Sequence, residues 1–476
     1  MWIIINIMIK RLANITLFIY AAVLAGCSTL PILTPDMAHK PLKAVQIQGV
    51  KGAFSAKKSQ EILAKLQKNG PDTNIFDKHL ALESALVDAP LSAGNGTELL
   101  IDGPATYTAM FKAIDEAKDH INMETFIIED DEIGHKFSAR LIKKQQEGVQ
   151  VNLIYDSFGS SKTPETFFNA MRESGINIVE FNPINPLSTK KDWELVRRDH
   201  RKLLVVDGQI GFVGGINISS VYSSGSYKKS KAKQIKIDKA TSVPWRDTHL
   251  KIVGPAVEEL QKLFIATWEE QKGKALAQKN YFPKPTAQGK GTAGKAIVRV
   301  IGSDPTEAYS QIYATLLSAI NSAETYIYIT NAYFVPDPQL LAALKEAVAR
   351  GVDVRLLLPA KTDSSLVYYA SRAYFYELLE AGVKIYEHKE SLLHAKTALI
   401  DGVWSTIGST NLDWRSFTNN HEVNAVILDD DFGVKMNQMF QEDLTASSLI
   451  TLETWKNRPI LNRIKERSAK LWARLL

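Results

Sequence analysis

The sequence is nearly free of cysteine, with one residue, Cys27, among 476. A single thiol excludes a small scaffold held together by disulfides. The sequence also lacks a strong charge of one sign, since 57 lysines and arginines face 52 acidic residues and the formal net charge is only +5. This excess is too small to favour a general nucleic-acid coat, so any basic binding surface has to be local.

The N-terminal region is strongly apolar but lacks a run long enough to cross a bilayer after its basic pair. Beyond Lys10 and Arg11, the apolar residues extend only from Leu12 to Leu24, whereas a membrane-spanning helix needs roughly 20 residues. Small residues then lead to Cys27. A basic pair, a short apolar stretch and small residues in this order are typical of an export signal.

The end of that stretch, Leu24-Ala25-Gly26-Cys27, resembles the lipobox of bacterial lipoproteins. The resemblance implies that residues 1–26 are a signal peptide and that Cys27 is lipidated. It places the protein in the bacterial cell envelope, facing the periplasm, and Ser28 after the cysteine favours the outer membrane over the inner one. The alternative is a core cysteine within an uncleaved anchor.

The remaining sequence has the balance of a folded chain, with 45% hydrophobic and 23% charged residues. This composition excludes a largely disordered chain, and the length allows two or more domains. Predicted helices and strands alternate from about residue 106, and their order repeats after a basic stretch rich in Gly, Pro and Gln. In the first half we expect one helix at 106–117 and a second helix that ends near residue 147. The expected strands of this half are at 121–128, 149–155 and 176–181. We expect second-half helices at 309–323 and 339–350, and second-half strands at 326–330, 352–358 and 383–386.

This order predicts an α/β fold with two pseudo-symmetric βαβ domains, whose mixed, largely parallel sheets are flanked by helices. The expected organisation is an N-terminal arm at 27–98, a first domain at 99–271, a linker at 272–296, a second domain at 297–450 and a C-terminal tail at 451–476. The tail is basic and amphipathic. Apolar residues recur in it at helical spacing among lysines and arginines: Leu461, Ile464, Leu471, Trp472 and Leu475. Such a helix suits either an anionic membrane surface or ordinary packing on the domain.

Each half contains the same polar motif at the same spacing. The first copy is His200-Arg-Lys202 with Asp207 five residues on and Asn217 after a Gly-Gly pair. The second copy consists of His394, Lys396, Asp401, Ser409 and Asn411. Because successive side chains of a strand alternate between faces, the histidine and lysine of each copy lie on one face.

The motif aspartates are each followed by glycine, in the dipeptides Asp207-Gly208 and Asp401-Gly402. Both dipeptides favour a hairpin turn, and the returning strand then brings Asn217 or Asn411 back beside the histidine and lysine. Lysine and asparagine donate hydrogen bonds to anionic oxygens, and histidine can attack phosphorus or move a proton. Two such sets facing one another favour a phosphodiester substrate. The aspartates themselves are candidates for either a catalytic or a turn-forming role.

A carboxylate follows each motif, at Asp247 and at Glu422. A histidine that acts as a nucleophile needs one ring nitrogen free and the other held by an acceptor. These two acids are therefore candidates to orient the histidines.

These motifs resemble the phospholipase D superfamily, whose His-x-Lys-x-x-x-x-Asp signature and following Gly-Gly/Ser-x-Asn occur twice per active site. Within it, the second half is similar to bacterial cardiolipin synthases over Ala332–Asp337, Leu392–Lys396 and Gly408–Ser416. The similarity extends from Leu99 to the C-terminus. Two features depart from those synthases, which commonly begin with transmembrane helices: the lipobox and a lysine-rich insertion at 227–239.

The resemblance implies a phosphatidyltransferase of the cardiolipin synthase type that works through a phosphohistidine, without a metal or other cofactor. In this scheme His200 attacks the phosphorus of phosphatidylglycerol and His394 protonates the departing glycerol, although the reverse assignment is open. The catalytic residues are then His200, Lys202, Asp207, His394, Lys396 and Asp401. The phosphate-binding residues are Asn217, Asn411 and Ser409.

The expected partners are an anionic phospholipid and a membrane surface, not nucleic acid. No dimer is required for catalysis, because the duplication supplies both halves of one site, and the chain is expected to act as a monomer. The alternatives are a hydrolytic phospholipase D, an exported nuclease of the same superfamily, and a lipid-binding module without activity. The last is disfavoured because both motif sets are complete.

Overall fold

The computed structural model describes residues 43–49, 52–69, 73, 75–184, 196–225, 243–283 and 294–476. The predicted signal peptide, Cys27 and the lysine-rich insertion at 227–239 lie outside the described residues. None of the helices in the described ranges is long and apolar enough to span a membrane.

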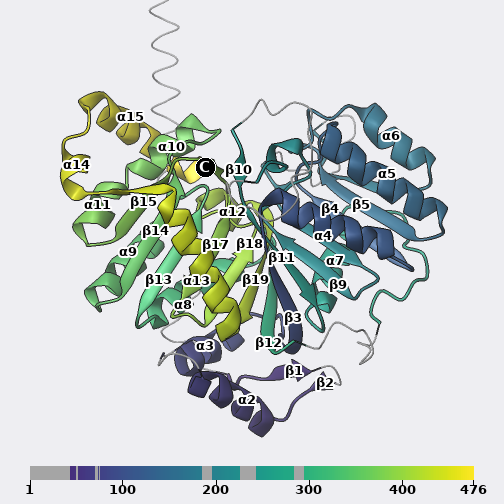
Figure 1. The fold of residues 1–476 in the computed structure, drawn as a ribbon, viewed down its shortest axis with the longest axis horizontal. Coiled ribbons are helices and arrows are strands. Elements are labelled where there is room, and N and C mark those ends of the chain that lie inside the picture. The colour runs from purple at the N-terminus through teal and green to yellow at the C-terminus, as the bar shows by residue number, and fades with distance from the viewer. Residues whose placement is uncertain are drawn as a thin grey trace, which may run out of the picture.

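One strand, β3 (Leu91–Ile101), pairs with both halves of the chain. It pairs antiparallel with β11 (Thr248–Val253) of the first half and with β12 (Ala296–Ser303) of the second half. Most of the described strands belong to one 18-stranded sheet, with the halves side by side in Figure 1, and two short strands form a separate two-stranded sheet. The domain boundary expected at residue 99 lies within β3.

In the first half, β4 pairs parallel with β5 and antiparallel with β8, and β5 pairs parallel with β6. Besides β3 and β11, the strands of this half are β4 (His120–Thr125), β5 (Gln150–Asp156), β6 (Asn177–Phe181), β7 (Arg198–Asp199), β8 (Lys202–Val206), β9 (Ile210–Gly214) and β10 (Trp245–Arg246). Its helices are α4 (Asp102–Glu116), α5 (Glu132–Gln146), α6 (Glu165–Glu173), η3 (Ser220–Tyr222) and α7 (Val257–Glu270).

The second half repeats this order, with β13 parallel to β14 and antiparallel to β17, and β14 parallel to β15. Besides β12, the strands of this half are β13 (Tyr326–Asn331), β14 (Asp353–Pro359), β15 (Lys384–His388), β16 (Leu392–Leu393), β17 (Lys396–Ile400), β18 (Trp404–Gly408), β19 (Asn420–Leu428) and β20 (Ser447–Ile450). Its helices are α8 (Gln311–Ser322), α9 (Pro338–Ala349), α10 (Ser365–Arg372), α11 (Phe375–Glu380), α12 (Trp414–Thr418), α13 (Asp430–Thr445), α14 (Leu452–Lys456), α15 (Ile460–Lys470) and η4 (Ala473–Leu475).

The expected alternation of helices and strands is confirmed in both halves, and equivalent residues bound equivalent helices. Asp131 caps the first turn of α5, and Asp337 caps that of α9, each by accepting two backbone N–H groups. The chain leaves these helices at Gly148 and Gly351, whose φ angles of 88° and 94° favour glycine. The expected α/β class, a mixed sheet flanked by helices, is likewise confirmed.

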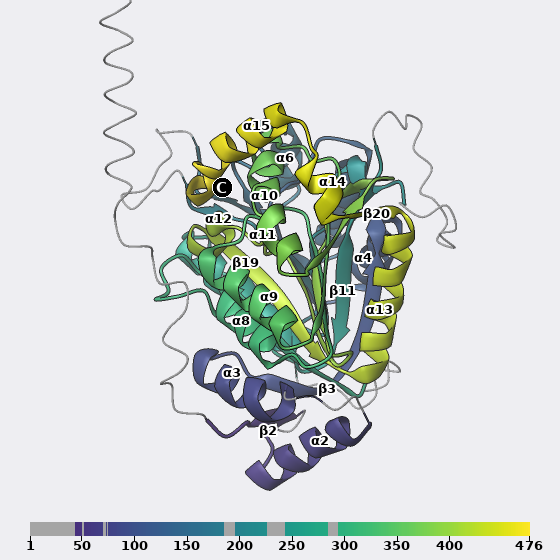
Figure 2. The ribbon, with the colours of Figure 1, turned by 90° about the vertical axis from the view of Figure 1, so that its left-hand side faces the viewer.

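Helices cover both faces of the sheet, as Figure 2 shows for α8 and α9 on one side and α13 on the other. One apolar core lies under α4 and α5 of the first half, and another lies under α8 and α9 of the second. A third joins α7 and α13 across the seam between the halves, where Phe264, Trp268 and Phe440 are buried. Apolar burial is therefore continuous across the seam.

The N-terminal arm contains β1 (Ile47–Gly49), β2 (Gly52–Ala53), α2 (Ala56–Asn69), η1 (Ile75–His79) and α3 (Leu80–Leu86). It packs on the second half, because Ile75, Phe76 and Leu80 join the core under α8. Strand β1 adds to the sheet by pairing parallel with β3. Figure 1 places this arm at one end of the molecule.

A buried ion pair fixes α13 to the seam, and its loss tests how the halves are held. Arg246 Nε and Nη2 each donate to a carboxylate oxygen of Asp443 at 2.9 Å, and both side chains are buried. Asp443→Ala leaves a buried cation short of its partner, so we expect the free energy of unfolding to fall by about 3–5 kcal/mol in a urea titration.

The matched control is Glu258→Ala, which removes one acid from an exposed pair with Lys262. An exposed pair contributes less than about 1 kcal/mol. Equal losses in the two variants would contradict the role assigned to the buried pair.

Candidate active site

The seam brings the two His-Lys motifs together through two short parallel ladders. His200 directly follows β7, which pairs with β19 of the second half. His394 directly follows β16, which pairs with β10 of the first half. Each motif therefore lies beside a strand of the opposite half, and that strand carries or adjoins an acid.

Each histidine is held by the acid of the opposite half. His200 Nδ1 lies 3.0 and 3.1 Å from the two carboxylate oxygens of Glu422. His394 Nδ1 lies 2.7 Å from Asp247 Oδ2. In both pairs the contact is made by Nδ1, so the carboxylate fixes the proton there and leaves Nε2 as the nitrogen available for chemistry. Pairing of acid and histidine was expected from the sequence, whereas the exchange between halves was not.

Burial and the neighbouring cations set the charge of these pairs. Burial lowers the pKa of His200 to about 4, although Glu422 opposes the shift. Burial and Lys396 likewise lower the pKa of His394. Burial alone would raise the pKa of Glu422, but the attraction of His200 and Lys202 is stronger and lowers it to about 2. At neutral pH, His200 is therefore a neutral imidazole beside an ionised carboxylate.

The two motif lysines are buried beside their own histidines. Lys202 Nζ donates to the carbonyl of His200 at 2.5 Å, and Lys396 Nζ donates to the carbonyl of His394. Burial lowers the pKa of Lys202 to about 7 and that of Lys396 to about 8, although nearby carboxylates oppose both shifts. Two ammonium groups that are short of counter-charge favour an anionic ligand.

The two asparagines and Ser409, predicted to bind phosphate, differ in how far their polar groups are already used. The buried Oδ1 of Asn411 has no partner, whereas Asn217 accepts from the Ile127 amide and donates to the Tyr222 hydroxyl. The free atom of Asn411 is an acceptor, which suits a hydroxyl group of a ligand, and Asn217 also positions a tyrosine.

Ser409, the third residue predicted to bind phosphate, is engaged by groups of its own half. Its hydroxyl donates to Glu422 and accepts from the Val423 amide, so in this structure it supports the orienting acid. The equivalent position in the first half is Gly215, where a Cβ would lie 2.2 Å from Asp247 Oδ1. The first-half acid therefore approaches the backbone more closely than a side chain would allow.

The motif aspartates lie at the far ends of their strands from the lysines. Lys396 begins β17, and Asp401 follows the last residue of that strand. A strand rises about 3.3 Å per residue, so the two residues are about 16 Å apart. The Asp401 carboxylate accepts three backbone N–H groups before and in β13, and Asp207 does the same before β4. Of the two roles that the sequence leaves open for them, these contacts favour the turn-forming one.

Both aspartates also form the hairpin turns that the sequence predicts. Their φ angles are 53° and 50°, and those of Gly208 and Gly402 are 61° and 72°. Positive φ at both central residues is the requirement of the tightest hairpin turn. The turn brings the strand with the asparagine back beside the histidine.

Aromatic side chains surround the histidines, and sequence analysis did not identify them. Phe126 lies 4.9 Å from the His200 ring, and Trp245 lies 5.1 Å from the His394 ring. The Tyr222 hydroxyl lies 3.4 Å from His394 Nδ1. The signal for Trp245 was its position two residues before Asp247, whereas nothing in the sequence marks Phe126 or Tyr222.

A cavity of about 340 Å³ opens beside this cluster. Its lining includes His200, Asn411 and Arg198, together with the aromatic residues Phe126 and Tyr333. A basic, partly aromatic cavity beside His200 can admit the head group of an anionic ester, while Lys396 Nζ lies 3.1 Å from His394 Nε2 on the other side of the cluster.

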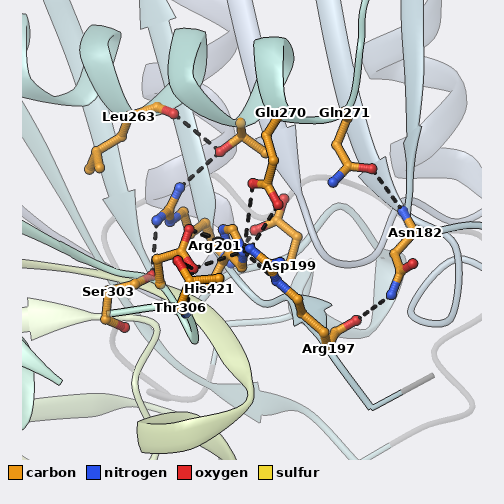
Figure 3. A network of polar contacts seen from close by, with 12 residues as sticks. Asn182, Arg197, Asp199, Arg201, Leu263, Glu270, Gln271, Ser303, Thr306 and His421 are labelled. Atoms are coloured by element: carbon orange, nitrogen blue, oxygen red, sulfur yellow. Dashed lines mark hydrogen bonds and ion pairs between the residues drawn. The ribbon is translucent and has the colours of Figure 1, made fainter. Parts of the chain in front are cut away.

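A second polar network lies behind the seam and braces the strands that carry His200 and Glu422 (Figure 3). Arg197 bonds Glu270 at 2.7 Å, Asp304 at 3.1 Å and His421 Nε2 at 2.9 Å. The three partners have ligand atoms within 4.8 Å of one another, as in a metal site. The guanidinium of Arg197, however, already supplies the cation at their centre.

Arg201 continues this brace between the two motif residues His200 and Lys202. Its side chain donates to the Glu422 carbonyl at 3.1 Å, to Thr267 at 2.9 Å and to the Ser303 carbonyl at 2.9 Å. Figure 3 shows Arg201 between α7 and the strands of the seam. The backbone on either side of the His200–Glu422 contact is therefore fixed by charged hydrogen bonds.

Comparison with known proteins agrees with this geometry. The family model described as "Cardiolipin synthase, PLD-like domain" matches residues 110–229 and 316–444, one segment in each half. A cardiolipin synthase of Geobacillus sp. (strain WCH70) is 38% identical over 399 residues, covering 83% of this chain and 76% of that protein. Cardiolipin synthase 2 of Bacillus anthracis is 37% identical over 381 residues, covering 80% and 70%.

Among solved structures, a phosphatidylserine synthase of Haemophilus influenzae Rd KW20 has the same fold. Its TM-score is 0.59 at 15% identity, and the match covers 83% of this chain and 96% of that one. The fold and the paired motifs are those of a phospholipase D-type enzyme. Within that class, the chain belongs to the family of cardiolipin synthases with PLD-like domains.

The structural role of the motif aspartates leads to a test with Asp401→Asn. The amide places an N–H donor against backbone donors, so we expect the free energy of unfolding to fall by about 1–3 kcal/mol. Turnover per folded molecule should stay within about threefold of the unaltered protein, because no contact at the reacting atoms changes. Chemical unfolding and a lipid-transfer assay at a temperature where both proteins are folded measure the two effects. A large loss of turnover in the folded protein would restore a catalytic role.

Proposed function

We propose that the protein transfers a phosphatidyl group from phosphatidylglycerol to a second phosphatidylglycerol, and so forms cardiolipin. The observation that carries this proposal is the exchanged pair of histidine–carboxylate contacts, which leaves two imidazole Nε2 atoms for one phosphorus. Membership of the cardiolipin synthase family supports the choice of lipid. We also infer that lipidation at Cys27 keeps the protein at a membrane of the cell envelope, facing the periplasm, with the outer membrane favoured.

In the first step, His200 is the nucleophile. It is neutral at pH 7, and its Nδ1 proton is held by Glu422, so the Nε2 lone pair can attack phosphorus. A P–N bond forms and the bond from phosphorus to the glycerol oxygen breaks. His394 acts in its protonated form, which Asp247 stabilises against burial and Lys396, and gives its Nε2 proton to the departing oxygen.

In the second step, His394 is neutral and works as a base. It takes the proton from a hydroxyl of the second phosphatidylglycerol, whose oxygen attacks phosphorus as the P–N bond breaks. Cardiolipin leaves and His200 is restored. Water in place of the second lipid gives phosphatidic acid, so the outcome depends on which hydroxyl occupies the cavity.

The charge that develops on phosphorus is met by the buried donors. Lys202 and Lys396 bind the nonbridging oxygens, and Asn411 supplies its amide from the cavity wall. Asn217 contributes its second amide hydrogen while it holds Tyr222. Donors that are fixed before the reaction cost no reorganisation in the transition state, and each is worth about 3 kcal/mol.

The first test compares His200→Ala and His394→Ala with the unaltered protein on phosphatidylglycerol vesicles, with products separated by thin-layer chromatography. We expect cardiolipin from the unaltered protein, none from His200→Ala, and a rate about 10²- to 10⁴-fold lower for His394→Ala. His135→Ala is the matched control, because this histidine is exposed on α5. Phosphatidic acid alone would indicate a hydrolase, and cleavage of plasmid with untouched lipid would indicate a nuclease.

The pH dependence of kcat/KM is a second test. The rate needs neutral His200, so it should rise with pH through about 4. It also needs protonated His394, whose pKa lies below its ordinary value, and charged lysines. It should therefore fall as His394 loses its proton, and fall further as pH passes about 7 to 8 and Lys202 and Lys396 lose theirs. We therefore expect a bell-shaped profile with its maximum between these limits. A rate that stays constant up to pH 10 would contradict the role of the buried lysines.

A further inference from the structure

The C-terminal segment turns its apolar side away from the protein. Six large apolar side chains of α15, η4 and the turn between them are 55–84% exposed: Ile460, Leu461, Ile464, Leu471, Trp472 and Leu475. A surface helix ordinarily buries its apolar stripe against the domain. An exposed apolar patch of this kind marks a contact with a partner or a membrane.

The opposite side of this segment is the packed one, and it uses small and paired side chains. Ala469 and Ala473 are buried in the core of the second half. Glu466 is buried against Arg458, with contacts of 3.1, 3.0 and 2.7 Å. The segment is therefore fixed to the domain without its apolar stripe, which remains available.

The charge around the stripe is positive. Its basic residues are exposed: Arg463, Lys465, Arg467, Lys470 and Arg474. Glu466 is the one acid in residues 460–476, and it is buried and paired. Apolar side chains flanked by lysine and arginine match the acyl boundary and the anionic head groups of a lipid surface.

The stripe is continuous with the mouth of the active-site cavity. Leu475 and Leu476 line that cavity together with His200, and the Arg415 amide of α12 donates to the Leu476 carbonyl at 2.8 Å. Phe158, half exposed, lines the same cavity from the first half. Figures 1 and 2 place α10, α15 and the C-terminus at one end of the molecule, opposite the N-terminal arm.

We propose that the apolar stripe of residues 460–475 and the half-exposed Phe158 form a docking surface for an anionic lipid bilayer. Docking places the cavity mouth at the membrane, so a phosphatidyl lipid reaches His200 without leaving the bilayer. The inference about lipid entry rests on the proposed function, whereas the contact with the bilayer does not. It is also separate from the lipid anchor, because it assigns one face of the folded protein to the membrane.

The contact can be measured in the full chain with Trp472 as a local probe. Vesicles of phosphatidylglycerol and phosphatidylcholine carry bromine on their acyl chains, and the quenching of Trp472 is the difference between the unaltered protein and Trp472→Phe. We expect strong quenching in these vesicles and weak quenching in vesicles of phosphatidylcholine alone. Ile464→Gln/Leu471→Gln should reduce the apparent affinity reported by quenching about tenfold or more, since two apolar contacts with the acyl boundary are lost.

The matched control is Val434→Gln/Leu449→Gln, which alters two equally exposed apolar residues outside the stripe. It should leave the quenching unchanged. Unquenched Trp472 in anionic vesicles would overturn the proposal. So would a shift from dimer to monomer in Ile464→Gln/Leu471→Gln on sedimentation, because the stripe would then bind a second copy of the chain.

A comparison of two substrates separates docking from chemistry. On phosphatidylglycerol vesicles, Ile464→Gln/Leu471→Gln should lose about tenfold in rate, in proportion to its weaker binding. On monomeric dihexanoyl-phosphatidylglycerol it should match the unaltered protein. Loss on both substrates would place the stripe in the site or fold and would overturn docking. An unaltered protein that binds vesicles but turns over neither lipid would refute the proposed function alone.

Discussion

Each motif histidine is held by a carboxylate from the opposite half of the chain, and the rest of the site depends on that exchange. His200 meets Glu422 and His394 meets Asp247 only because β7 pairs with β19 and β10 pairs with β16. Neither half alone can orient its own imidazole. The duplication therefore yields one site, and the packing of α7 and α13 across the seam stabilises it.

The exchange also governs the charge balance of the site. Two ammonium groups, two imidazoles and two carboxylates are buried together, and isolated charges would be costly there. The Glu422 carboxylate keeps a low pKa only through its cationic and imidazole neighbours, and the lysines hold their protons weakly. A bound phosphodiester supplies the missing negative charge. Substrate binding and the stability of this cluster are thus coupled, and the polar brace through Arg197 and Arg201 holds the backbone that bears it.

Much of the fold could be predicted from the sequence because the signals were local. Asp131 and Gly148 bound α5 as a cap and a stop, and Asp401-Gly402 forms its turn within two residues. The identity of the histidine partners could not be predicted, since it depends on contacts between residues far apart in the chain. The catalytic role of Asp401 and the phosphate-binding role of Ser409 stay predictions, and the sequence could not show that backbone amides and Glu422 contact their oxygens. The apolar residues of the tail were predicted as a helical stripe, but only packing decides which side faces outward.

The most direct test of the central claim is the configuration at phosphorus after transfer. A phosphatidyl donor is made chiral at phosphorus by an isotope at one nonbridging oxygen or by sulfur in its place, and the product that the protein forms from it is analysed by phosphorus NMR. Two successive in-line displacements, first by one histidine and then by the acceptor oxygen, predict overall retention. Overall inversion would show a single displacement without a covalent histidine, and would contradict the account of two imidazoles acting in turn on one phosphorus.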